Sequence, residues 1–185
     1  MGDSPIHQAA KAISERLDEA GIEHAVAGAI ALGAHGVVRA TEDVDLLITR
    51  EGLARFKKEW LGRGYVDLRP GGKAVRDTRN DVKIDFLITG DFPGDGQPKP
   101  IAFPEPSATV GDGDAPYPVV SLLRLLELKL ASGMTAAHRL QDLADVLRLI
   151  EVRQLPRETA DELNPYVREK FLELWQVAQH PADDY

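Results

Sequence analysis

Two segments of the chain alternate apolar and polar residues over the length of a strand, and this alternation limits the fold more than any other feature. The apolar residues of each segment share one face: Val44, Leu46 and Ile48 in the first, and Val82, Ile84, Phe86 and Ile88 in the second. A period of two residues is typical of a β-strand that buries one face. The chain therefore requires a sheet with a covering layer on one side and a polar surface on the other.

Helical periodicity surrounds these strands. Ser4 and Pro5 precede apolar residues at 3.6-residue spacing as far as Leu17, which predicts an N-terminal amphipathic helix. Further helices are expected at 28–34 and 51–61, and strands at 65–69, 73–78 and 81–89. The first half thus has the pattern of an α/β domain.

Residues 90–118 hold seven of the chain's 12 prolines, which predicts an irregular connection with short strands near 99–103 and 107–110. Helices are expected after it, from Ser121 to Ser132, from Thr135 to about Val152, and between and after Pro156 and Pro165, with Gly133 as a break. We predict an α/β fold with a small mixed sheet, flanking helices and a C-terminal helical lobe. The expected domains are an α/β core at 1–90, a connection at 91–118 and a helical lobe at 119–185.

Composition excludes several classes of function. The 185 residues include no Cys, so disulfides, thiolate zinc sites and cysteine nucleophiles are absent. The most apolar stretch, residues 25–34, is short and interrupted by Gly28 and Gly33, so no membrane-spanning helix is expected. No secretory leader pattern opens the chain, which predicts a cytoplasmic protein. The formal charge of −8 repels polyphosphate backbones, so nucleic acid is expected only as a locally bound acceptor.

The polar faces of the two alternating strands carry carboxylates. Asp43 and Asp45 lie two residues apart on one face, about 6 to 7 Å along the strand, and Asp85 has the same position on the second strand. If the two strands are neighbours, three acidic groups converge, and their repulsion requires cations. Oxygen ligands of this kind suit Mg²⁺ shared with substrate phosphates. The pattern predicts a metal-dependent phosphoryl or nucleotidyl transfer, with two ions at the site when substrate is bound. The alternative is a merely solvated strand face.

The segment from Val26 to Gly36, followed by Arg39-Ala40-Thr41-Glu42-Asp43-Val44-Asp45, resembles the first motif of the nucleotidyltransferase superfamily related to DNA polymerase beta. The closer resemblance is to the small bacterial branch with the AbiEii-type toxins and the antibiotic nucleotidyltransferases. Lys83-Ile84-Asp85-Phe86-Leu87 resembles the position of the third carboxylate. The resemblance covers most of residues 20–150.

This resemblance implies transfer of a nucleoside monophosphate from an NTP to a hydroxyl or phosphate acceptor, which is a small molecule, tRNA or a protein. It implies Asp43, Asp45 and Asp85 as catalytic metal ligands, and Gly28, Ala29 and Lys129 as nucleotide contacts. A toxin-like role would bring a neutralising protein partner. Ala29 stands where the superfamily usually has Ser or Gly. The alternative is therefore a non-catalytic nucleotide-binding or protein-interaction module that retains the fold.

Three further features have two interpretations each. Lys129 either reaches nucleotide phosphates or is a surface lysine. Arg139 and Asp142, three residues apart, form an intrahelical ion pair rather than a ligand contact. In residues 69–83 five basic side chains stand against two acidic ones. The basic residues Lys73, Arg76 and Arg79 either contact acceptor or phosphate at the edge of the cleft or protect an edge strand from aggregation. His35 is expected to be structural.

Overall fold

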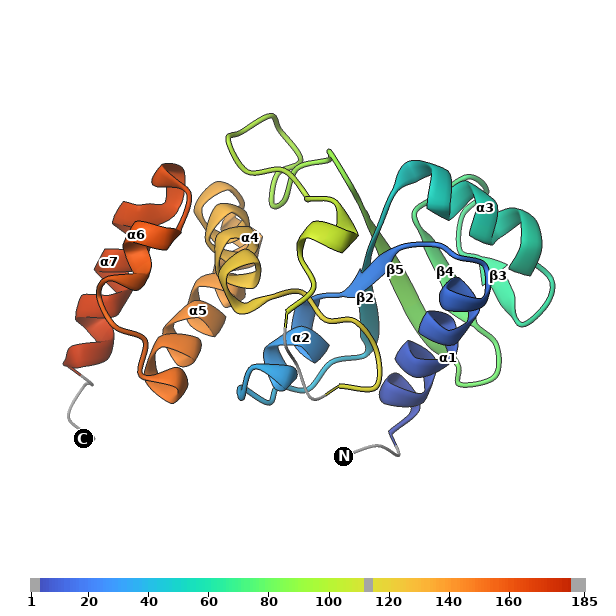
Figure 1. The fold of residues 1–185 in the computed structure, drawn as a ribbon, viewed down its shortest axis with the longest axis horizontal. Helices are drawn as coiled ribbons and strands as arrows, with labels where there is room; N and C mark the ends of the chain where they lie inside the picture. Colours follow the sequence, from blue (N-terminus) through green and yellow to red (C-terminus); the bar gives the residue numbers. More distant parts are fainter. Residues whose placement is uncertain (1–3, 112–114, 181–185) are drawn as a thin grey trace.

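The computed structural model describes residues 4–111 and 115–180. Its centre is a five-stranded sheet in the order β1-β2-β5-β4-β3, in which β2 and β5 are parallel and the other pairs are antiparallel (Figure 1). The strands are β1 (His24–Val26), β2 (Asp43–Ile48), β3 (Tyr65–Asp67), β4 (Ala74–Asp77) and β5 (Val82–Ile88). The prediction of a small mixed sheet is confirmed.

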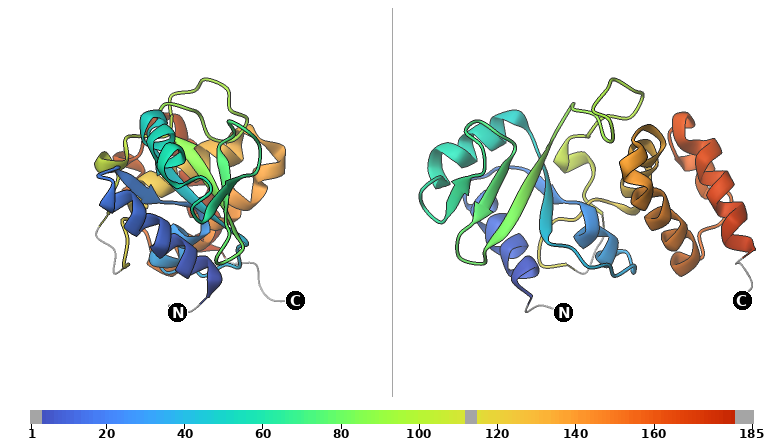
Figure 2. Two further views of the ribbon diagram at one scale, coloured as in Figure 1. Left: turned by 90° about the vertical axis from the view of Figure 1, so that its right-hand side faces the viewer. Right: turned by 180° about the vertical axis from the view of Figure 1, so that it is seen from behind.

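Helices flank the sheet and extend beyond it. In the first half they are α1 (Pro5–Glu19), α2 (Gly28–Ala34) and α3 (Arg50–Trp60). In the second half they are η1 (Pro106–Ala108), α4 (Leu122–Thr135), η2 (Ala137–Arg139), α5 (Leu140–Arg153), α6 (Thr159–Glu162) and α7 (Pro165–Gln179). In Figures 1 and 2, α4 to α7 form a group of their own beside the sheet, as expected for the helical lobe. No helix within the described ranges combines the length and the apolar character needed to cross a bilayer.

One face of the sheet is buried under α1 and α3. Ser4 caps α1, with its hydroxyl accepting from the amide of His7, and Pro5 occupies the first turn, where its missing N–H costs nothing. Ala9, Ala10, Ile13 and Leu17 of α1 are fully buried, and Phe56 of α3 packs its ring against Phe86 of β5 at 5.6 Å between centroids. The alternating apolar residues of β2 and β5 therefore face this core, and their polar residues face the other way.

The connection between the two halves is irregular, as predicted, but the strand expected at 99–103 does not form. Near 107–110 the structure has the short helix η1 and a single antiparallel bridge between Val110 and Val120. The start of the helical part is tied to the sheet, because Val26 of β1 donates to Pro118 O at 2.8 Å and accepts from Val120 N at 3.0 Å. The division into domains stays a prediction.

The expected helix break at Gly133 is wrong. Helix α4 continues through this residue to Thr135, and the next α-helix begins only at Leu140, not at Thr135. A Cβ at Gly133 would lie 2.6 Å from Leu143 Cγ. Gly133 therefore allows the close approach of α4 and α5 and does not end a helix, a role that depends on a neighbour distant in the sequence.

Candidate functional site

The structure brings the three predicted carboxylates together. Strands β2 and β5 are adjacent and parallel, Asp45 is the register partner of Asp85, and Asp43 is the partner of Lys83. Neighbouring strands lie about 4.8 Å apart, so three acidic side chains share one small area of the polar face. The proximity depends on the strand order, which the spacing of the residues did not determine.

Gly28 begins α2 directly against Asp45. Its φ of +58° lies in the left-handed region, and a Cβ built there would be 1.9 Å from Asp45 Oδ2. Ala27 N also donates to Asp45 O at 2.9 Å, which holds the start of α2 against β2. Ala29 does not line the same cleft but a separate cavity of about 540 Å³. Of the predicted pair, the structure therefore places only Gly28 at the carboxylates.

This contact makes Gly28→Ala a specific test. We expect it to displace the Asp45 carboxylate and to cost about 1–2 kcal/mol of stability from the left-handed backbone alone. Gly21 is the matched control, because its φ is +61° and nothing lies within 4 Å of a Cβ there. Thermal melts should show a larger loss for Gly28→Ala than for Gly21→Ala. Equal losses of thermal stability would show that the Asp45 carboxylate moves aside without destabilising the fold.

Lys83 already supplies a positive charge to the carboxylates. Its Nζ lies 2.5 Å from Asp85 Oδ2 and 3.9 Å from Asp43 Oδ2. The hydrogen bond to Asp85 raises the pKa of Lys83 despite its partial burial. The cluster thus attracts a cation, and here an ammonium stands in that position.

The electrostatics of Asp45 differ from those of its neighbours. Burial, followed by the charges of Asp43 and Asp85, raises its pKa from 3.8 to about 6. No salt bridge reaches the Asp45 carboxylate within the part of the chain that the structure describes. Ionised Asp45 therefore has no paired cation, and the charges of Arg139 and Lys129 offset only part of the rise in its pKa.

This shift predicts a pH-dependent cost to stability. Below pH 3.8 the Asp45 carboxyl is protonated in both the folded and the unfolded state. Between pH 3.8 and about 6 it is ionised in the unfolded state but still protonated in the folded state, so the free energy of unfolding falls as pH rises. The full cost above pH 6 is about 3 kcal/mol. With EDTA present, Asp45→Asn should therefore be more stable than the parent protein at pH 8 and equal to it near pH 4. Urea unfolding at both pH values, with Asp161→Asn as the control for losing one charge, measures the difference. An equal gain at both pH values would contradict the prediction.

The donor set at the carboxylates fits a hard divalent ion. All three groups offer oxygen, the ligand that Mg²⁺ prefers, and their repulsion is relieved by positive charge. In the described residues, no three His, Cys, Asp or Glu side chains already stand in metal-binding geometry. An ion held by Asp43, Asp45 and Asp85 would therefore replace the ammonium of Lys83.

The opposite wall of the cleft comes from the helical lobe. Lys129 of α4 is only 6% exposed, and its Nζ donates to Asp142 Oδ1 at 2.9 Å and to Asp145 Oδ2 at 2.7 Å, both on α5. The interpretation of Lys129 as a surface lysine is wrong. Burial alone raises the pKa of Asp142, but the Lys129 ammonium and a hydrogen bond from Ser132 outweigh it and lower the pKa. The ionised pair is thus fixed inside the protein.

Two arginines complete this wall. Arg139 Nε lies 2.9 Å from Asp142 Oδ2, which confirms the predicted ion pair, although Arg139 lies just before α5 and not within it; half of its side chain stays exposed. Arg39 Nε lies 3.5 Å from Asp145 Oδ1 and joins the loop before β2 to α5. Sequence analysis gave Arg39 no role, although it lies four residues before Asp43 in the segment that carries the resemblance. Thr41 in that segment donates to Asp43 Oδ1 at 3.0 Å.

The two walls enclose a cleft of about 620 Å³. Its lining includes Gly28, Arg39, Thr41, Glu42, Asp43, Asp45, Lys83, Asp85, Lys129, His138, Arg139, Gln141 and Asp142. The sheet side is negative and the helical side carries lysine and arginine. Such a cleft has room and charge for a phosphorylated ligand together with a cation.

The structure does not bring Lys73, Arg76 or Arg79 to the lining of this cleft. Lys73 pairs with Asp91, and Arg76 pairs with Asp81 although it is the register partner of Lys83. Arg79 lines a small pocket elsewhere. His35 ends α2, and its Nε2 lies 2.7 Å from Val120 O, which agrees with a structural role.

Comparisons with known proteins add little to this geometry. No protein-family model matches the sequence, and no curated protein matches it. Among solved structures, a solution structure of the antibiotic-resistance factor ANT(2'')-Ia is similar at 16% identity and a TM-score of 0.43, over 92% of this chain and 83% of that one. At this level the likeness carries no argument about activity.

Proposed function

We propose that this protein is a Mg²⁺-dependent nucleotidyltransferase that moves a nucleoside monophosphate from an NTP to a hydroxyl or phosphate acceptor. The observation that carries the proposal is the convergence of Asp43, Asp45 and Asp85 on adjacent strands in a cleft whose other wall presents Lys129 and Arg139. The resemblance of residues 26–45 to the superfamily motif supports the same assignment.

The transfer exchanges one bond for another. An acceptor oxygen forms a bond to the α-phosphorus, the bond from that phosphorus to the bridging oxygen of the β-phosphate breaks, and pyrophosphate leaves with the electron pair. For a hydroxyl acceptor, Asp85 takes the proton as general base. A bound Mg²⁺ would supply neutralisation of the charge that develops on the phosphate oxygens.

Residues of the helical wall would hold the triphosphate. An ammonium has three N–H donors, and Lys129 uses two of them on Asp142 and Asp145, which leaves one for a phosphate oxygen. Arg139 lines the cleft and bonds Asp142 and Ser132 through Nε, so among the described residues its terminal nitrogens stay available to a ligand. Gly28, lacking a side chain, keeps the backbone accessible beside Asp45.

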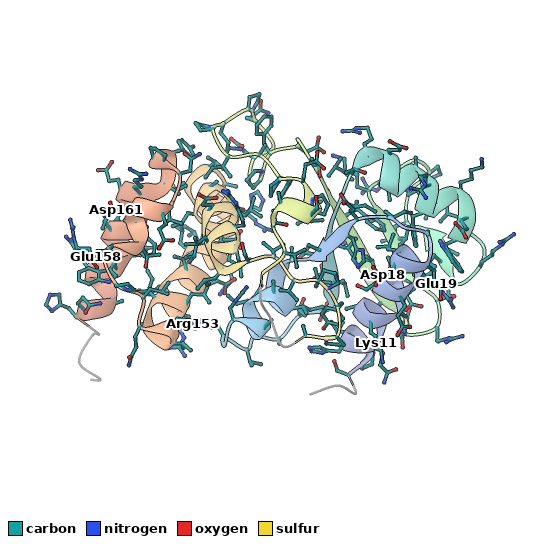
Figure 3. All side chains as sticks on the ribbon, viewed as in Figure 1. Lys11, Asp18, Glu19, Arg153, Glu158 and Asp161 are labelled. Atoms are coloured by element: carbon teal, nitrogen blue, oxygen red, sulfur yellow. The ribbon has the colours of Figure 1, made fainter. Side chains whose placement is uncertain are left out.

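The test is calorimetric titration with each of the four NTPs, with and without Mg²⁺, followed by transfer of α-labelled NTP to small-molecule, tRNA and protein acceptors. We expect Mg²⁺-dependent binding that disappears in the D43A/D45A variant. E158A/D161A is the control, since it also removes two negative charges, at the far end of the helical lobe (Figure 3). Binding that is equal in both double variants would refute the assignment.

A second function is favoured by the position of Lys83. Its ammonium already neutralises part of the carboxylate cluster, an arrangement that a non-catalytic nucleotide-binding or interaction module could keep permanently. This module would bind NTP equally with and without Mg²⁺ and would transfer nothing to any acceptor. Lys83→Met separates the two functions, because it should strengthen Mg²⁺-dependent binding in an enzyme and leave binding by the module independent of Mg²⁺.

A further inference from the structure

A second basic site lies outside the cleft, on the side of the sheet that α1 covers. A pocket of about 70 Å³ is lined by Arg16 of α1, Arg63 and Tyr65 at the start of β3, and Asp77 and Arg79 at the end of β4. It shares no lining residue with the carboxylate cleft. A cavity of this size has room for a few water molecules or for one small anion.

Backbone pairing makes these arginines converge. Tyr65 is the register partner of Asp77, and beyond this pair both the amide and the hydroxyl of Thr78 donate to Gly64 O, at 2.9 and 3.0 Å. The residues on either side, Arg63 and Arg79, are thereby held next to one another. Arg16 reaches the pocket from α1 with its guanidinium 4.7 Å from the centre of the Trp60 ring.

Tyr65 supplies a neutral donor. The residue is 5% exposed, and its ring packs edge-on against Phe56 at 5.1 Å between centroids. Its hydroxyl has no hydrogen-bond partner in residues 4–111 and 115–180, although the side chain lines the pocket. Burial, reinforced by Asp77, raises the pKa of Tyr65 to about 12, so the hydroxyl keeps its proton. The Tyr65 hydroxyl is not one of the fully buried polar atoms that lack a partner in the described residues, so it is accessible from the pocket and can donate to a ligand there.

The charge of the pocket is positive in an acidic protein. Among the residues that line it, Asp77 is the single acid, and its carboxylate already accepts from the amide of Arg79 and the side chain of Asn80. Arg16 pairs with Glu19, which lies at the end of α1 (Figure 3). Arg63 and Arg79 form no salt bridge with any described residue. Two guanidinium groups therefore remain for an anion.

We propose that Arg16, Arg63, Tyr65 and Arg79 form a binding site for a phosphate-type oxyanion, distinct from the catalytic cleft. The guanidinium groups donate to the oxyanion from the rim, and the Tyr65 hydroxyl donates from the base. The bound group is either a free phosphate ion or a phosphate ester of a larger ligand. The site is independent of nucleotidyl transfer, so failure of one assignment leaves the other untouched.

Amide chemical shifts in a ¹H–¹⁵N spectrum test this site directly. The ligands are inorganic phosphate, methyl phosphate and dimethyl phosphate, each titrated at low ionic strength without divalent ions. We expect saturable shifts at Gly64, Tyr65 and Arg79. Tighter binding of methyl phosphate than of inorganic phosphate would identify a terminal ester, and tighter binding of dimethyl phosphate a backbone diester.

Matched variants decide whether the pocket causes the shifts. R63A/R79A should weaken binding at least tenfold, whereas R148A/R153A removes the same charge from α5 and should leave it unchanged. Tyr65→Phe keeps the ring and removes only the hydroxyl, and it should weaken binding severalfold with little change in melting temperature. Absence of saturable shifts for all three ligands, or equal binding by the two double variants, would overturn the proposal.

Discussion

Asp45→Asn is expected to lower nucleotidyl transfer by about 10³-fold or more while the protein remains folded. Asp45 faces Asp85 across β2 and β5 and packs against Gly28, so the amide keeps the shape of the side chain and loses only its charge. The measurement is incorporation of α-labelled NTP at saturating Mg²⁺. The same variant should gain stability at pH 8 without metal, and this opposite change separates loss of chemistry from loss of structure.

The control for this experiment is Asp161→Asn, an exposed acid on α6 whose removal should leave transfer unchanged. A transfer rate for Asp45→Asn within threefold of the parent protein would exclude Asp45 from catalysis. Loss of activity accompanied by a lower melting temperature at pH 8 would contradict the view that the ionised carboxylate is kept for function at a cost to stability.

The second large effect concerns Lys129. Replacement by Met leaves the carboxylates of Asp142 and Asp145 buried without the ammonium that bridges them. Breaking a buried ion pair on one side costs about 3–5 kcal/mol, because the remaining charges stay desolvated. Arg139 and Arg39 compensate only in part, since each reaches one of the two acids from a half-exposed position.

Urea unfolding of Lys129→Met measures this loss. Lys170→Met is the matched control, because Lys170 pairs with Glu173 on the surface of α7 and should contribute about 0–1 kcal/mol. The triple variant Lys129→Met, Asp142→Asn, Asp145→Asn should recover much of the lost stability, since no buried charge remains. A loss below 1 kcal/mol for Lys129→Met alone would show that water enters the network and solvates the acids.

The two walls of the cleft have opposite electrostatic arrangements. Among the described residues, the carboxylates of the sheet wall form salt bridges with Lys83 alone, whereas the acids of the helical wall pair with Lys129, Arg39 and Arg139. The carboxylates of the sheet wall favour binding of a cation, and the helical wall presents N–H donors that can bind an anion. A cation–phosphate complex satisfies both walls at once.

Local pattern was sufficient for the elements of the first half and for the faces of the strands. The alternation in β2 and β5 identified Asp43, Asp45 and Asp85 as residues of one polar surface, because successive side chains of a strand point to opposite sides. The same reasoning failed at Gly133, where a glycine that normally ends helices serves close packing against Leu143. It also failed for the burial of Lys129, because its two carboxylate partners lie on another helix.

Sequence pattern predicted the local pair of Arg139 with Asp142 but no partner that is distant in the chain. The adjacency of β2 and β5, the contact of Lys83 with Asp43, the link from Arg39 to Asp145 and the meeting of Arg16 with Arg63 and Arg79 all join positions far apart in the chain. Secondary structure and amphipathic faces arise from interactions within a few residues, so sequence periodicity contains them. Strand order and helix packing depend on the burial of the whole apolar surface, and only the folded chain shows which charges this burial brings together.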